Sequence, residues 1–133
     1  MIHLETTVVH PDFRGLGLQK LTLDYATKWS IAKGYRYMFC TVSPYNPISL
    51  NNIMSGGLKV RDLKKKYGNE EHPGYLRYIL SRDLNVSCND CWPKFKFCPI
   101  TDIDTQKKLI ETGFVGHHYL KSSQRMAYAK CLC

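Results

Sequence analysis

The stretch of sequence that decides the fold is Val8-Val9-His10-Pro11-Asp12-Phe13-Arg14-Gly15-Leu16-Gly17-Leu18-Gln19. Its order predicts a short β-branched strand, a Pro-Asp turn and a glycine-containing loop that opens a helix. Such a loop places free backbone N–H groups at a helix N-terminus beside an arginine, which suits a phosphate or pyrophosphate. The two glycines at alternate positions carry no Cβ, so the backbone can approach a bound group closely. The stretch therefore predicts a site for a phosphorylated cofactor.

Strands and helices alternate on both sides of this loop. We expect a strand over Leu4–Val9, a helix over Gly15–Lys33 and a second strand over Tyr35–Val42. A strand, a helix and a second strand within so short a stretch of sequence make a βαβ unit, so the two strands should be parallel. Apolar residues recur at three- and four-residue steps along the helix and predict the face that packs on the sheet; they are Leu18, Leu21, Tyr25, Trp29 and Ala32.

A second helix is expected after the second strand. Asn46 suits its N-cap, Pro47 suits its first position, and Gly56-Gly57 suits its end. Residues Leu58–Tyr67 and Tyr75–Arg82 then read as two strands of a hairpin. These elements complete a predicted core over residues 1–84.

The residue composition and the hydrophobic pattern change after Leu84. Residues Asn85–Pro99 read as a loop rich in cysteine and aromatic residues, and Thr101-Asp102-Ile103-Asp104 reads as the start of a helix that ends before Gly113. A final hairpin is expected over Phe114–Leu120 and Arg125–Leu132. We interpret residues 85–133 as an extension of loop, helix and hairpin that packs on the same domain.

Composition narrows the class of protein. The chain has 133 residues, an apolar fraction of 44% and a formal net charge of +8, which is typical of one folded domain with a basic surface. Such a surface attracts polyanions or simply aids solubility. No recognised RNA-binding motif accompanies the charge, so nucleic acid is not favoured as a partner. The sequence shows neither a membrane span nor a secretory signal, and we expect a cytoplasmic protein without a membrane partner.

Residues 4 to about 82 resemble the C-terminal half of the GNAT superfamily of N-acetyltransferases. The first block of the resemblance is Val9-His10-Pro11 with Arg14-Gly15-Leu16-Gly17, where Arg14 and Gly17 match the acetyl-CoA motif and Gln19 stands in place of the usual Gly or Ala. The second block runs from Thr41-Val42-Ser43-Pro44-Tyr45-Asn46-Pro47-Ile48-Ser49 to Gly57-Leu58. The resemblance implies an α+β fold with a βαβ core, a mixed sheet and flanking helices, here a partial GNAT-like fold with a C-terminal helix–hairpin extension.

The resemblance also implies a cofactor site. Acetyl-CoA would lie between two parallel strands that splay apart, with its pantetheine arm on the backbone of Thr7, Val8 and Val9. Its pyrophosphate would lie on the loop and first turn of the helix, formed by Arg14, Gly15, Leu16, Gly17, Leu18 and Gln19. Asn46 and Ser49 would form part of the opposite wall.

In this family an acceptor amine attacks the thioester directly. The tyrosine that often acts as the general acid is replaced by Ile53 here. Tyr45 is the candidate substitute, and Glu5 is the candidate base; the alternatives are a packed aromatic residue and an ordinary strand carboxylate. The implied function is acetyl-CoA-dependent N-acetyl transfer to a small-molecule or peptide amine. A coenzyme A binder without strong catalysis is the alternative, and an interaction module held by zinc is a third reading.

The family fold has further strands and helices ahead of the acetyl-CoA strand, and this chain has only a few residues there. We expect the extension or a second copy in a homodimer to cover the exposed sheet edge. Six cysteines are present, and Cys88, Cys91 and Cys98 could hold zinc with a fourth ligand from Cys131, Cys133, His117 or His118. The alternative is a set of reduced cysteines in a loop.

Overall fold

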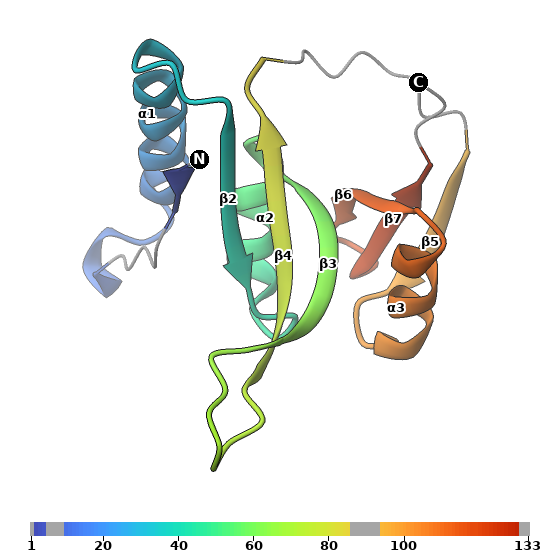
Figure 1. Ribbon diagram of the computed structural model, residues 1–133. Helices are drawn as coiled ribbons and strands as arrows, with labels where there is room; N and C mark the ends of the chain where they lie inside the picture. The colour runs from blue at the N-terminus through green and yellow to red at the C-terminus, as the bar shows by residue number, and fades with distance from the viewer. Residues whose placement is uncertain (1, 5–9, 86–93, 131–133) are drawn as a thin grey trace.

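A computed structural model describes residues 2–4, 10–85 and 94–130. These residues form a seven-stranded mixed sheet in the order β1-β2-β4-β3-β6-β7-β5, with three α-helices and one short 3-10 turn at Pro11–Phe13. The elements are β1 (Ile2–His3), α1 (Leu18–Ala32), β2 (Tyr37–Val42), α2 (Pro47–Ser55), β3 (Lys59–Lys66), β4 (Tyr75–Asp83), β5 (Phe95–Pro99), α3 (Ile103–Glu111), β6 (Val115–Leu120) and β7 (Arg125–Ala129). Figure 1 shows α1 and α3 at opposite ends of the sheet. The predicted α+β class is confirmed.

The N-terminal elements form the expected βαβ unit. Strands β1 and β2 are parallel, with Ile2 opposite Met38 and His3 opposite Phe39, and the N–H of Leu4 donates to the carbonyl of Phe39 at 2.8 Å. Pairing thus begins two residues before the predicted strand start at Leu4. Residues 5–9, the rest of that predicted strand, lie outside the described residues.

Helix α1 differs from the prediction at its start and in its buried face. It begins at Leu18 rather than Gly15, because Gly15 and Gly17 adopt left-handed φ angles of 83° and 71° that an α-helix excludes. The predicted apolar face is wrong: Leu21 and Tyr25 are 65% and 71% exposed, and Leu18, Trp29 and Ala32 are exposed as well. The buried positions are instead Leu23, Thr27 and Ser30.

The two hydroxyl residues on the buried side of α1 explain this difference. Thr27 and Ser30 donate hydrogen bonds to the carbonyls of Leu23 and Ala26, one turn earlier. Their polar atoms are therefore satisfied inside the helix and can be buried at little cost. Leu23 supplies the apolar contact on this face, close to Gly56 after α2.

Helix α2 and the following hairpin match the prediction. Asn46 caps α2 by accepting a hydrogen bond from the N–H of Ser49 at 3.2 Å, Pro47 occupies the first turn and Gly56 is the C-cap. Strands β3 and β4 then pair in antiparallel register. Strand β4 also pairs with β2, so it lies between β2 and β3. In Figure 1, α2 lies behind β2 and β4.

The C-terminal elements extend the same sheet. Asp102 caps α3, and β6 and β7 form the predicted hairpin. The interpretation of residues 95–99 as loop is wrong, because they form β5 and pair with β7 from Phe95–Ala129 to Pro99–Arg125. The alternation of apolar and polar residues that marks a strand covers only five residues here, and the aromatic residues on the N-terminal side of the segment obscure it.

One pair of residues joins the two parts of the sheet. Strands β3 and β6 are in register at Val60 and Gly116, and both strands have a bulge next to this point. Among the described helices, none is long and apolar enough to cross a membrane.

Candidate functional site

The loop before α1 is shaped by its glycines. Both Gly15 and Gly17 have positive φ, and a Cβ built at either position would meet no other atom within 4 Å. The left-handed backbone therefore requires glycine, and the space beside it is open. This openness is what a loop that contacts a ligand through its backbone needs.

The first turn of α1 presents backbone donors beside this open space. The first hydrogen bond within the helix runs from the N–H of Leu21 to the carbonyl of Gly17. The N–H groups of Leu18, Gln19 and Lys20 come before that bond, and Gly17 provides no side-chain cap. These amides and the positive end of the helix dipole favour an anion here. Arg14, exposed on the same loop, adds a positive charge.

A cavity of about 690 Å³ is lined by residues of the parallel strands β1 and β2 and of the two N-terminal helices. Residues from β1, α1, β2, α2, β3 and β4 or their ends line it: His3, Leu4, Gln19, Thr22, Leu23, Ala26, Cys40, Thr41, Val42, Ser43, Asn46, Ser49, Ile53, Tyr67 and Arg77. Three of the predicted cofactor residues, Gln19, Asn46 and Ser49, are among them. The volume is within the range of small-molecule and cofactor sites.

Gln19 joins the two helical walls of the cavity. Its side-chain amide donates to the hydroxyl of Ser49 at 3.2 Å and accepts from the side-chain amide of Asn52 at 2.8 Å. A glutamine at a position where the family usually has Gly or Ala thus ties the first turn of α1 to α2. The backbone N–H of Gln19 is independent of this tie.

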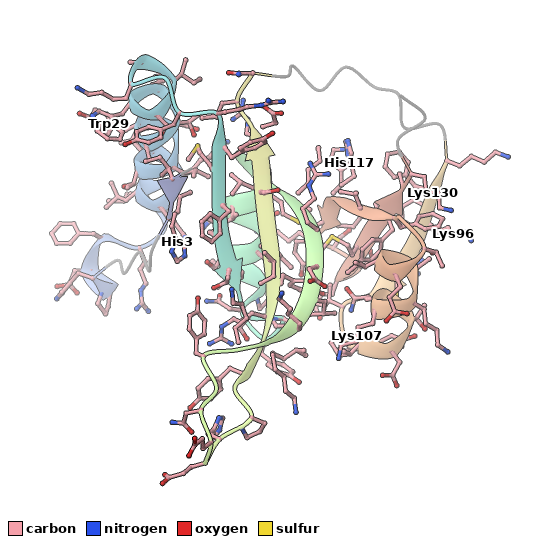
Figure 2. All side chains as sticks on the ribbon, viewed as in Figure 1. His3, Trp29, Lys96, Lys107, His117 and Lys130 are labelled. Atoms are coloured by element: carbon pink, nitrogen blue, oxygen red, sulfur yellow. The ribbon has the colours of Figure 1, made fainter. Side chains whose placement is uncertain are left out.

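The sheet side of the cavity carries polar groups that the sequence analysis missed. The ring of His3 stacks on Phe39 with centroids 4.3 Å apart, and Figure 2 shows it beside β2. The hydroxyls of Thr41 and Tyr67 are 2.8 Å apart. Arg77, half-buried on β4, completes this group. Little in the sequence marks them, since they come from separate elements; Arg77 stands out only as a charge between Leu76 and Tyr78.

The cavity also contains a thiol. Cys40 is 3% exposed, and burial raises the pKa of its thiol to about 12. At neutral pH the thiol is therefore protonated, and it is a poor nucleophile. This chemistry does not suit Cys40 as a covalent carrier of an acyl group.

The predicted catalytic residues are not brought together in the described structure. Glu5, with Thr7, Val8 and Val9 of the predicted cofactor set, lies outside the described residues. Tyr45 is 80% exposed and is not among the described residues that line the cavity. Ile53, at the position of the family tyrosine, does line it.

The cysteine-rich segment gives no metal site among the described residues. Within them, no group of three or more His, Cys, Asp or Glu residues could hold a metal ion. Cys98 is buried, and its thiol lies near the carbonyls of Pro99 and Asp102, at 3.5 and 3.8 Å. The other predicted ligands Cys88 and Cys91, like Cys131 and Cys133, fall outside the described ranges, so zinc stays a prediction.

The rings of His117 and His118 lie 4.3 Å apart on β6, and both are near Phe95. The contacts of both histidine rings with Phe95 place the two histidines next to β5. Neither histidine is among the described residues that line the cavity. They belong to the far end of the sheet from α1 (Figure 2).

Comparison with known proteins adds one finding to this geometry. No curated protein and no solved structure matches the chain. Residues 1–52 match the acetyltransferase (GNAT) family, and this segment holds β1, the glycine loop, α1, β2 and the first turns of α2. The match covers 52 of the 133 residues and shows that this N-terminal segment is similar to that family.

Proposed function

We propose that this chain is an acetyl-CoA-dependent N-acetyltransferase. The observation that carries the proposal is a cavity lined by residues of the parallel strands β1 and β2 and by Gln19, which follows the open glycine loop at the start of α1. Both lie mainly in the segment that matches the GNAT family. A family whose members transfer acetyl groups thus provides the chemistry that this geometry suits.

The cofactor would lie along the cavity with its diphosphate at the start of α1. The N–H groups of Leu16 to Gln19 and the charge of Arg14 would bind the diphosphate. The backbone of Thr7, Val8 and Val9 would hold the pantetheine arm as an added strand does. Asn46 and Ser49, which line the cavity, would contact the arm from α2.

Transfer would proceed by direct attack. The amine nitrogen forms a bond to the thioester carbonyl carbon, the C–S bond breaks, and coenzyme A leaves as a thiolate that takes up a proton. A base must remove a proton from the amine, and Glu5 is the residue we propose for it. A backbone N–H near Val9 would stabilise the oxyanion. The high pKa of Cys40 favours this direct route over an acyl-cysteine route.

The geometry favours Tyr67 over Tyr45 as the acid. Tyr67 lines the cavity and shares a hydrogen bond with Thr41, whereas Tyr45 is not among the lining residues and is more exposed, at 80% against 59%. Tyr67 is therefore the residue that we propose as the proton donor to the leaving thiolate. The shared hydrogen bond with Thr41 can orient the hydroxyl of Tyr67.

Two measurements test the proposal. Calorimetric titration with acetyl-CoA should give a saturable binding heat, and release of free thiol in the presence of an amine panel should report transfer. Binding without thiol release from any amine would support the alternative of a coenzyme A binder without catalysis, which the replacement of the family tyrosine by Ile53 favours. Absence of binding heat and of any thermal shift would contradict both.

A further inference from the structure

The charge of the cavity points to a class of acceptor, an inference that rests on the proposed acetyl transfer. Among the described residues that line the cavity, none is an aspartate or a glutamate, while Arg77 is a permanent cation. A cavity built for a polycationic acceptor would be expected to present several carboxylates. The described lining presents the opposite sign.

Arg77 lies on the same face of the sheet as Thr41, and both residues line the cavity. Thr41 is opposite Ile79 in the antiparallel pairing of β2 with β4. Arg77 is two residues from Ile79 and therefore projects from the same side as Thr41. Cys40 and Val42 alternate to the other face of β2, where they are buried, although both also line the cavity. Arg77 and Thr41 thus line the cavity from one face of the sheet, and the hydroxyl of Tyr67 is hydrogen-bonded to that of Thr41.

The guanidinium of Arg77 has more N–H donors than the hydrogen bonds that it makes with the described residues. One of its nitrogens donates to the carbonyl of Leu76 at 2.9 Å, and the group lies 5.5 Å over the ring of Tyr75. Among the described residues no carboxylate pairs with it. The neighbouring cation Lys64, which is opposite Arg77 in the β3–β4 register, is paired with Asp62 at 3.7 Å. Arg77 is therefore the cation of this pair that can receive an anion.

We propose that the acceptor of the acetyl group is an amine that also carries a carboxylate, and that Arg77 binds this carboxylate. The planar guanidinium matches a carboxylate with two parallel hydrogen bonds, and its cation–π contact with Tyr75 helps to hold it in place. An amino acid bound at Arg77 would lie in the cavity that Thr41 and Tyr67 also line, and their hydroxyls can orient it.

The test compares amino acids with their amides, which keep the amine and remove the negative charge. The wild-type protein should show a kcat/KM for thiol release at least 10-fold higher with the amino acids. Arg77→Gln should lower kcat/KM for the amino acids by about 10-fold or more, because a charge-assisted pair is lost, and change that for the amides less than 3-fold. Arg77→Lys should lose part of the preference, since lysine cannot form the planar pair.

Lys64→Gln is the matched control. It removes one positive charge opposite Arg77 but not from the cavity lining, and should change kcat/KM for amino acids and amides by less than 3-fold. An equal loss for acids and amides in Arg77→Gln would overturn the proposal, because it would assign Arg77 a structural role. Preference for amides or for polyamines in the wild type would overturn it too.

A binding readout separates this proposal from the proposed acetyl transfer. The Nε–H resonance of Arg77, assigned by its loss in Arg77→Lys, should shift in nuclear magnetic resonance spectra on addition of amino acids and stay fixed with their amides. The shift is expected even if no thiol release is ever detected, which would contradict the acetyl transfer alone. A fixed resonance with every amino acid would contradict the carboxylate site, whatever the outcome for acetyl-CoA.

Discussion

At the scale of single residues, Tyr45 and Tyr67 are rival candidates for the general acid, and substitutions distinguish them. Sequence reasoning selects Tyr45, whereas we propose Tyr67, which lines the cavity and hydrogen-bonds to Thr41. We expect Tyr67→Phe to lower kcat for thiol release by about 100-fold, as removal of a general acid commonly does. Tyr45→Phe is the matched control and should leave kcat within 3-fold. A large loss in Tyr45→Phe with none in Tyr67→Phe would restore the sequence-based choice.

An ion pair between two strands should make stability depend on pH. The hydrogen bond from Arg36, with a nitrogen–oxygen distance of 3.1 Å, holds the pKa of Asp83 below its usual range, and a bond from the N–H of Asn85 acts in the same direction. Because the folded-state pKa is lowered, the stabilisation is fully present above the unfolded-state pKa of about 4. It is lost as the pH falls through the folded-state pKa.

The comparison of Asp83→Asn with the wild type checks this. The melting temperature of Asp83→Asn should be lower than that of the wild type at pH 7, and the difference should shrink steadily below pH 4. Arg36→Gln should behave in the same way, because it removes the other partner. A difference in melting temperature that is equal at pH 7 and pH 2 would contradict the assignment to this pair.

At the scale of elements, a buried glutamine on α3 joins the helix to the sheet. The side-chain oxygen of Gln106 accepts hydrogen bonds from the hydroxyls of Tyr78 and Tyr128, at 2.6 and 2.8 Å, and its nitrogen donates to the carbonyls of Ile100 and Asp102. All three side chains are fully buried. Every polar atom in this cluster is satisfied only because the glutamine offers two acceptor sites and two donors.

Gln106→Leu should therefore destabilise the protein by about 3–5 kcal/mol. The leucine fills a similar volume but leaves two tyrosine hydroxyls and a carbonyl buried without partners, and each such group costs about 1–3 kcal/mol. Tyr128→Phe, the matched control, removes one bond and one donor together and should cost about 1 kcal/mol. Urea denaturation measures both; a cost below 1 kcal/mol for Gln106→Leu would show that water reaches the cluster.

The elements also show what sequence reasoning can reach. Capping residues act locally, so Asn46 and Asp102 located the starts of α2 and α3 correctly. The buried face of α1 could not be found this way. Its apolar stripe is real, but Leu23, Thr27 and Ser30 pack inward because the hydroxyls are satisfied within the helix. Which face of a helix is buried depends on the elements that pack against it, and the spacing of apolar residues along the helix does not reveal those elements.

The whole molecule depends on the junction between its two groups of strands. Gly116 faces Val60 across that junction, and a Cβ at Gly116 would lie 2.6 Å from the Cβ of Val60. Gly116→Ala should destabilise the protein by about 1–3 kcal/mol, because neither backbone can move away without disturbing the sheet. Gly56→Ala is the control: its Cβ would meet the flexible end of Leu23, and it should cost less. Equal costs in thermal denaturation would argue against a tight junction.

At this largest scale the candidate site divides into a predictable and an unpredictable part. The glycine loop, Asn46 and Ser49 lie within or next to short motifs, and the sequence located them. His3, Thr41, Tyr67 and Arg77 come from four separate strands or strand ends, and they line one cavity because these strands are neighbours in the order β1-β2-β4-β3 with β4 inserted between β2 and β3. That insertion depends on tertiary pairing, which local sequence does not encode.

The central claim is that the glycine loop at the start of α1 binds the diphosphate of acetyl-CoA. Gly17 and Gly34 mark the two ends of α1; both have positive φ, of 71° and 81°, and at both a side chain would enter open space. Valine at either position should therefore cost similar stability, about 1–2 kcal/mol or more. Only at Gly17 would the side chain occupy the space of the diphosphate.

Calorimetric titration of acetyl-CoA into the wild type, Gly17→Val and Gly34→Val tests this claim most directly. Thermal denaturation of each variant first establishes that it is folded, and Gly17→Ala serves if the valine variant is not. The account predicts wild-type affinity in Gly34→Val and at least a 10-fold weaker affinity in Gly17→Val. Equal affinity for acetyl-CoA in all three proteins would contradict it.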